Sequence, residues 1–431
     1  SESIYWMNTH VVTPSQFEQL LSEQDNPNVE EVSSDSTFKT LDVKGMGEFK
    51  VSKKEWPRYT PGSVEFVNAK ARADRYHRIF HHSAERMERN IALGHGYGCK
   101  PGDSQYLSPC HICFRTGIDK SPRHHKTREV SDRTEWKPGE CWYIDGADSV
   151  VYSEWGNKRY CIHAVDAASF YRVTYYTCTN NAREFAEFID YLSKVSRIQA
   201  GNPVKKILSD YFSTYMEQHR IASLRAQDGI TLEVIPPDMH HKNTYAEGAI
   251  YLQRKAARAR LAQIQGMIVR GSRISNTEKY WPFAWEHATQ CHNFSAYESL
   301  TQLHGHAISP IQAFTGDMKY RIPELREFGE IGYVLYQPSK RPNKLFDTSQ
   351  RCYYMFNGSY NPFTNIYANA PQAHVVLTDD GQLRVSGKVV FPKLDATPSA
   401  VDSTRVQAMS SCVYFPKGNT KSRNQPFRLP H

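Results

Sequence analysis

The sequence lacks long apolar runs: no stretch approaches the roughly 18 residues that a membrane-spanning helix needs. Its opening residues, SESIYWMNTH, lack the apolar core of a signal peptide. Cysteine is sparse, with nine residues in 431. An odd number argues against a disulfide framework and for a reducing compartment. We therefore expect neither a membrane span nor a secreted disulfide scaffold.

Charge is unevenly distributed along the chain. The net charge is +8, but residues 1–48 hold nine acidic and only two basic side chains. The rest of the chain therefore carries about +15, a balance that suits a polyanion such as nucleic acid. Many proteins without such a partner have a similar balance, so charge alone does not decide the function.

Three acidic residues lie where polar sequence follows a short apolar run. Asp145 follows Cys-Trp-Tyr-Ile, Asp210 follows Lys-Ile-Leu-Ser, and Glu247 opens a long stretch of helical pattern. Buried strands hold the residues at their ends in fixed positions. Three such carboxylates can hold two Mg²⁺ ions roughly 3.5–4 Å apart, which is a site for in-line phosphodiester transfer.

Simpler interpretations of these residues remain open. An Asp at a strand end is common in a chain with 45 acidic residues. The run Thr-Tyr-Ala-Glu that ends at Glu247 also fits a capping box, in which the Glu only satisfies a backbone donor. Asp148, Asp166 and Asp238 compete for the same metal role.

A second group of residues has the spacing of a zinc site. The run RYHRIFHHSAERM supplies two histidines, and CHIC supplies two thiols about 27 residues downstream. The expected ligands of one structural Zn²⁺ are His77, His82, Cys110 and Cys113. His81 is the alternative to His82, and Cys99 and His111 are neighbouring decoys.

These blocks, in this order, resemble a retroviral-type integrase, and most closely the integrases of copia-type (Pseudoviridae) LTR retrotransposons. YHRIFHHSAERM resembles that family's W-H-x-R-L-G-H-x-S opening, and CHICFRTGIDKSPRH resembles its C-x-x-C-x-x-G-K stretch. PGECWYIDGAD, ILSDYF and HHKNTYAEGAIYLQRKAARA resemble its three catalytic blocks. ISPIQAFTGDMKYRIPELREFGEIGYV and GKVVF resemble its closing segments, so the likeness runs from about residue 75 to 392.

The chain departs from the family pattern near the acidic residues. Tyr211 and Phe212 follow the second Asp where Asn-Gly is usual, and Gly248 follows the Glu where a basic residue or Ser is common. The segment between Asp210 and Glu247 is also one residue longer than in the family pattern. These departures bring the substrate contacts into question, but they remove no metal ligand.

The resemblance implies a DNA integrase with Asp145, Asp210 and Glu247 as catalytic ligands of two Mg²⁺ (or Mn²⁺) ions. Such an enzyme trims the 3′ ends of the element's cDNA and joins them to target DNA. Basic residues on the Glu247 helix would hold the DNA phosphates: Arg254, Lys255, Arg258 and Arg260. A catalytically silent, domesticated DNA-binding or scaffold protein and a cut-and-paste transposase are the alternatives.

The resemblance also implies partners and a location. The expected partners are the LTR termini of the cDNA, target DNA, further copies of the chain (at least a dimer, with a tetramer or larger assembly expected) and a host tethering factor. The expected location is the nucleus, after assembly in cytoplasmic virus-like particles. A start at Ser1 fits a product cut from a polyprotein, although a trimmed chain would look the same.

We expect an α/β multidomain protein with five parts. An acidic extension with a small hairpin spans 1–55, a helical His₂Cys₂ zinc module 56–130, and a ribonuclease-H-like core with a mixed five-stranded sheet 131–320. A small β-barrel spans 321–395, and a basic flexible tail without a compact basic cluster spans 396–431.

Overall fold

The structure is a computed structural model that describes most of the chain between residues 10 and 392. The described residues are 10–22, 29–34, 38–43, 47–52, 54–117, 135–149, 151–210, 229–235, 244–268, 274, 276–336, 348–358, 360–361, 366–367 and 373–392. The tail expected over 396–431, the competing Asp238 and the last part of the zinc module lie outside these residues. No helix among the described residues has the length and apolarity to cross a membrane.

The N-terminal part forms a four-stranded sheet with one helix. Its elements are β1 (His10–Val12), α1 (Pro14–Ser22), β2 (Val29–Ser34), β3 (Phe38–Val43) and β4 (Gly47–Ser52). The strand order is β1-β4-β3-β2, with β1 parallel to β4 and the other pairs antiparallel. Phe17 of α1 packs on Val51 of β4 beneath the sheet. The expected hairpin is therefore present as β3–β4, and β1, β2 and α1 extend it beyond what the sequence predicted.

The zinc module is helical. Its elements are α2 (Val64–Phe80), α3 (Ala84–Ala92), the 3₁₀ turn η1 (Asp103–Tyr106) and α4 (His111–Gly117). Ser63 and Ser83 cap α2 and α3, because each side chain accepts a hydrogen bond from a backbone N–H of the first turn. The core around Tyr76 and Met87 also contains Cys291 and Leu325 from much later in the chain. The module therefore does not pack on itself alone.

The central sheet is mixed and has five strands. They are β5 (Cys141–Asp148), β6 (Tyr160–Asp166), β7 (Arg172–Thr177), β8 (Lys206–Asp210) and β9 (Thr231–Ile235), in the order β7-β6-β5-β8-β9. β6 pairs antiparallel with both neighbours, whereas β5, β8 and β9 are parallel. Trp142 and Ile144 alternate onto one face and pack with Phe188 of α5 (Ala182–Val195), which continues into the π-helical turn η2 (Ser196–Ala200).

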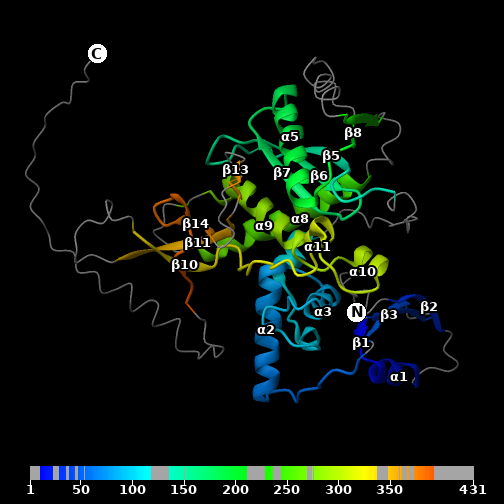
Figure 1. The fold of residues 1–431 in the computed structure, drawn as a ribbon. Coiled ribbons are helices and arrows are strands. Elements are labelled where there is room, and N and C mark those ends of the chain that lie inside the picture. The colour runs from blue at the N-terminus through cyan, green and yellow to red at the C-terminus, as the bar shows by residue number, and fades with distance from the viewer. Residues whose placement is uncertain are drawn as a thin grey trace, which may run out of the picture. The chain divides into compact units, whose positions relative to one another are not determined.

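Two long helices pack together beside this sheet (Figure 1). They are α8 (Thr244–Met267) and α9 (Trp281–Asn293), and the short η4 (Thr277–Tyr280), α10 (Glu298–His304) and α11 (Pro310–Thr315) accompany them. α8 contacts β5 and β6, and α9 contacts β7. Every residue of α9 is buried, so α9 lies in the interior of the protein and the sheet contacts it on one side only.

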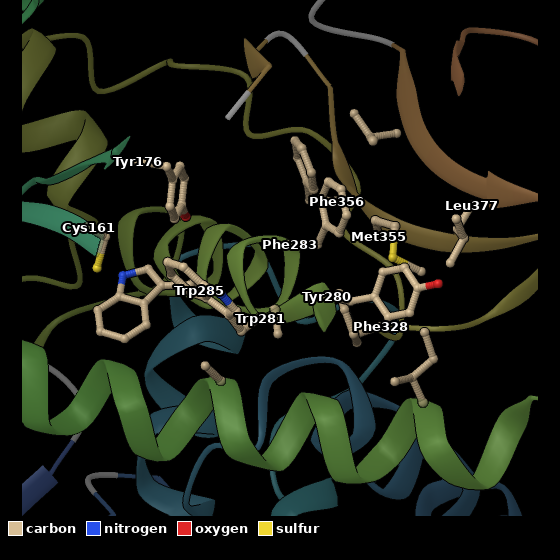
Figure 2. Close-up of a cluster of buried hydrophobic side chains, with 14 of the residues drawn as sticks. Cys161, Tyr176, Tyr280, Trp281, Phe283, Trp285, Phe328, Met355, Phe356 and Leu377 are labelled. Atoms are coloured by element: carbon tan, nitrogen blue, oxygen red, sulfur yellow. The ribbon is translucent and has the colours of Figure 1, made fainter. Parts of the chain in front are cut away.

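The C-terminal part is an antiparallel sheet that shares its core with the central region. Its strands are β10 (Ile331–Leu335), β11 (Ser349–Asn357), β14 (His374–Thr378), β15 (Leu383–Ser386) and β16 (Val389–Val390), and β12 (Tyr360–Asn361) pairs with β13 (Ile366–Tyr367). The order β15-β14-β11-β10-β16 does not close into a ring among the described strands. Figure 2 shows Phe283 of α9 beside Phe356 of β11, whose rings stack with centroids 6.0 Å apart. One hydrophobic cluster therefore runs across the boundary that we expected near residue 320.

Candidate functional site

Two histidines and two cysteines of the zinc module converge. They are His77, His81, Cys110 and Cys113, and one ligand atom of each lies within 4.8 Å of the others. The Cys113 sulfur is 3.2 Å from His77 Nε2 and 3.2 Å from His81 Nδ1, and the Cys110 sulfur is 3.9 Å from His81 Nδ1. In a tetrahedral site with Zn–S bonds near 2.3 Å and Zn–N bonds near 2.0 Å, ligand atoms lie roughly 3.3–3.8 Å apart. The four side chains therefore fit a zinc ion.

Hydrogen bonds on the outer side of each ring select the ring nitrogen that faces the cluster. His77 Nδ1 lies 2.9 Å from the carbonyl of His82, and His81 Nε2 lies 2.8 Å from Oε1 of Gln263. Each of these nitrogens must carry the proton, because its partner is an acceptor. His77 Nε2 and His81 Nδ1 are then left with lone pairs directed at the cluster, as metal ligation requires.

The fourth member of the cluster is His81, in place of the His82 that we expected. α2 ends at Phe80, and His81 adopts a left-handed backbone (φ 54°) with its N–H bonded to the carbonyl of His77. This turn directs the His81 ring to the thiols, four residues after His77. The His82 side chain is buried, stacks on Phe80 and lies 3.2 Å from the Tyr76 hydroxyl through Nδ1. It therefore belongs to the core, although its carbonyl orients His77.

The electrostatics of the cluster favour a bound cation. The pKa of Cys110 lies below its usual value because the Cys113 thiol donates a hydrogen bond to its sulfur, and the same bond raises the pKa of Cys113. Burial lowers the pKa of His81, which keeps its imidazole neutral. Zinc binds cysteine as the thiolate, so metal binding would displace the remaining thiol protons.

Strand pairing places the first two acidic residues side by side along the backbone. β5 and β8 are parallel, and Ile144 pairs with Ser209. Asp145 and Asp210 each follow one residue later, so they occupy neighbouring positions on adjacent strands, about 4.8 Å apart. Asp145 Oδ1 accepts the N–H of Gly146 at 2.7 Å. The structure describes the backbone of Asp210 but not its side chain, so the distance between the two carboxylates stays untested.

The third acidic residue lies in the first turn of α8. Glu247 is half-buried there. Two residues earlier on α8, the Tyr245 ring packs against Tyr143 of β5, with centroids 5.1 Å apart. Tyr143 and Asp145 lie on the same face of the strand, because side chains alternate. The first turn of α8 therefore lies over the face of the sheet that carries Asp145.

Two of the competing acidic residues have structural partners. Asp166 is fully buried and accepts hydrogen bonds from the N–H groups of Gly139 and Ser169 and from the Ser169 hydroxyl. Burial raises its pKa to about 6. Asp148 forms an ion pair with Arg159 at 3.1 Å. Both carboxylates are thus engaged in fixing turns and strand ends.

The basic residues of α8 divide between its two sides. Arg254 and Arg258 are exposed, and Lys255 is half-buried. Arg260, which we expected to contact DNA, is 1% exposed, and its Nε donates to His287 Nδ1 at 2.7 Å. It lies 13 residues after Glu247, which at 100° per residue is about 220° round the helix. Arg260 therefore belongs to the interior.

A cavity of about 540 Å³ lies apart from these residues. It is bounded by β7, α5 with η2, α9 and the segment 320–324, and its lining includes Arg172, Glu286 and Arg321. Neither the three acidic residues nor the zinc-cluster residues line it. The cavity is therefore separate from the candidate site.

Comparison with known proteins identifies no family. No protein-family model and no curated protein matches the sequence. The fold is similar to a chain in the complex of the simian T-cell lymphotropic virus intasome with the PP2A regulatory subunit B56 gamma, at 13% identity and a TM-score of 0.32. That similarity covers 69% of this chain and 90% of the other. A likeness of this size assigns neither a family nor a site.

Proposed function

We propose that this chain is the integrase of a copia-type LTR retrotransposon, which trims the 3′ ends of the element's cDNA and joins them to target DNA. The observation that carries the proposal is the strand register that places Asp145 and Asp210 side by side beneath the first turn of α8, which holds Glu247. The mixed five-stranded sheet, with the order β7-β6-β5-β8-β9 and β6 antiparallel to both neighbours, supports the ribonuclease-H-like core of this proposal.

The residues present fit metal-dependent phosphodiester transfer. Carboxylate oxygens are the ligands that Mg²⁺ prefers, and two strands and a helix supply them from rigid positions. Two Mg²⁺ ions, when bound, would supply activation of the attacking oxygen and stabilisation of the leaving oxygen. Arg254 and Arg258 are exposed seven and eleven residues after Glu247, on the same side of α8, where they can hold the phosphates of the cDNA end. The chemistry needs no Tyr or Ser nucleophile.

The zinc cluster has a structural role in this proposal. Four protein ligands close the coordination sphere, so no position is left open for substrate. The ion would tie the end of α2 to the CHIC turn at the start of α4, and α4 packs against α8. Zinc thus supports the helix that carries Glu247.

The proposal includes an assembly and a place of action. Joining two cDNA ends to two target strands takes two active sites, so the active form is a homo-oligomer. It would act in the nucleus, after assembly in cytoplasmic virus-like particles, with a host factor guiding it to its target.

A strand-transfer assay with the element's own LTR ends and Mg²⁺ or Mn²⁺ tests the function. Asp145→Asn, Asp210→Asn and Glu247→Gln should each abolish joining while sparing zinc content, folding and DNA binding. Glu187→Gln is the matched control, because Glu187 lies on α5 and forms an ion pair with the exposed Arg183. Near-normal joining by any of the three variants would show that the wrong carboxylate was chosen. Native protein that binds the ends but never joins them would indicate a silent, domesticated descendant.

A further inference from the structure

Gln263 of α8 connects the zinc cluster to the rest of the protein. The side chain is 4% exposed. Its Oε1 lies 2.8 Å from Nε2 of His81, while its Nε2 donates to the carbonyl of Arg78 at 3.2 Å and to Glu327 Oε1 at 2.6 Å. Glu327 also forms an ion pair with Arg78 at 3.0 Å. The Gln263 amide thus connects α8 to the end of α2 and to the segment that leads into β10.

These contacts allow only one orientation of the amide. Both acceptors, the Arg78 carbonyl and the Glu327 carboxylate, require the NH₂ group, and reversing the amide would set its oxygen against two other oxygens. The oxygen therefore faces His81 and must receive a proton from Nε2. His81 is left with its lone pair on Nδ1, which lies 3.2 Å from the Cys113 sulfur.

The backbone of His81 makes this contact more important. A non-glycine residue with φ 54° is in the left-handed region, which is energetically unfavourable for residues with a Cβ atom. The hydrogen bond to Gln263 and the bond to a metal both act on the ring that this backbone presents. The hydrogen bond to Gln263 and the metal bond therefore both stabilise the same conformation of His81.

We propose that Gln263 is a positioning residue of the zinc cluster, through which metal binding and the docking of α2 on α8 stabilise one another. The inference rests on the zinc site proposed above and not on strand transfer. It predicts that the metal affinity of the module depends on a side chain 150 residues beyond Cys113. It also predicts that zinc loading tightens the contact between the module and α8.

The test compares Gln263→Met with Gln265→Met in the full chain. Methionine keeps the volume and helix propensity of glutamine but accepts no strong hydrogen bond. Gln265 is an exposed residue of the same helix, so its substitution is the matched control. Competition for Zn²⁺ with a chromophoric chelator should show a roughly 10- to 100-fold loss of affinity for Gln263→Met and none for Gln265→Met.

Two further measurements distinguish positioning from packing. In zinc-free protein, long-range ¹H–¹⁵N spectra of the histidines should show His81 protonated at Nε2 in the native chain and mixed tautomers in Gln263→Met, because without metal the Gln263 oxygen selects the protonated nitrogen. The double variant Gln263→Glu with Glu327→Gln exchanges the amide and the carboxylate, and it keeps an acceptor toward His81. The new carboxylate cannot donate to the Arg78 carbonyl, so the zinc affinity should recover only in part, to within about tenfold of the native value. This variant also decides the matter if Gln263→Met fails to fold.

Three results would overturn the inference. One is a Gln263→Met protein that binds zinc within about twofold of the native affinity with unchanged His81 protonation. Another is a folded double variant that has lost zinc. The third is native protein that binds no zinc, which would also remove the proposed zinc site. Failure of strand transfer by zinc-loaded protein would count against the proposed function and leave the role of Gln263 intact.

Discussion

His81 and His82 are adjacent in the sequence, yet their removal should have opposite consequences. In the structure His81 faces the two thiols, whereas His82 is buried against Phe80 and Tyr76. We expect His81→Ala to weaken zinc binding, and to cost the metal-free protein mainly the hydrogen bond to Gln263. We expect His82→Ala to destabilise the module while leaving zinc affinity nearly unchanged. The second expectation holds because the His82 carbonyl, which orients His77, is retained in alanine.

The magnitudes follow from the contacts that each side chain makes. Apparent zinc-binding free energies of structural sites are about 10–16 kcal/mol, so the loss of one ligand in four removes about 3 kcal/mol, or roughly a hundredfold in affinity. The His82 ring is 9% exposed. Deleting a buried ring of this size leaves a cavity and removes one of the two hydrogen bonds of the Tyr76 hydroxyl, which keeps Asn90 as a donor, at a cost of about 2–3 kcal/mol.

Chelator competition measures the first effect, and urea unfolding of zinc-free protein measures the second. Ser83→Ala is a useful third variant, because it removes the cap of α3 beside both histidines and should cost about 1 kcal/mol without touching the cluster. A His82→Ala protein that loses zinc, together with a His81→Ala protein that keeps it, would refute the assignment. The pair His77 and His82 would then be the ligands.

Three further predictions concern charge. Burial raises the pKa of Glu286 from 4.5 to about 7; the folded state therefore keeps a proton that the unfolded state releases between these values. The stability of the native protein therefore falls as the pH rises through this window. The urea midpoint of Glu286→Gln, measured relative to that of the native protein, should increase from about pH 5 to about pH 7 and then remain constant. Arg260→Ala should cost about 3 kcal/mol of unfolding free energy, since it empties a buried site and removes the hydrogen bond to His287 Nδ1; an unchanged urea midpoint would contradict its burial. Arg258→Glu should weaken binding of LTR ends more than Arg428→Glu in salt-dependent titrations, and the reverse order would place the main DNA contact in the tail.

The sequence alone predicted those features that depend on neighbouring residues. The apolar runs before Asp145 and Asp210 are strands, and β8 ends at Asp210 as the run KKILSD indicated. β5 continues three residues past Asp145, to Asp148. Glu247 lies in the first turn of α8, where the change to a helical pattern placed it. Strand alternation and helical periodicity are local properties, and they can be read from a few consecutive side chains.

Other features could have been read from the sequence but were missed. A His pair four residues apart lies on one helical face more closely than a pair five apart, and this favours His81 over His82. The same periodicity places Arg260 on the opposite side of α8 from Glu247.

Only the tertiary structure decided what distant residues do together. No local pattern marks Gln263 as the partner of His81, 182 positions earlier, because an amide in a helix usually faces solvent. Nor does the sequence show that Phe356 stacks on Phe283, or that Cys291 lies in the core of the zinc module. Hydrophobic burial is non-directional, so it specifies that these side chains are inside but not which others they meet. The partners are set by the packing of whole elements, which fixes His81, Gln263 and α8 in one place.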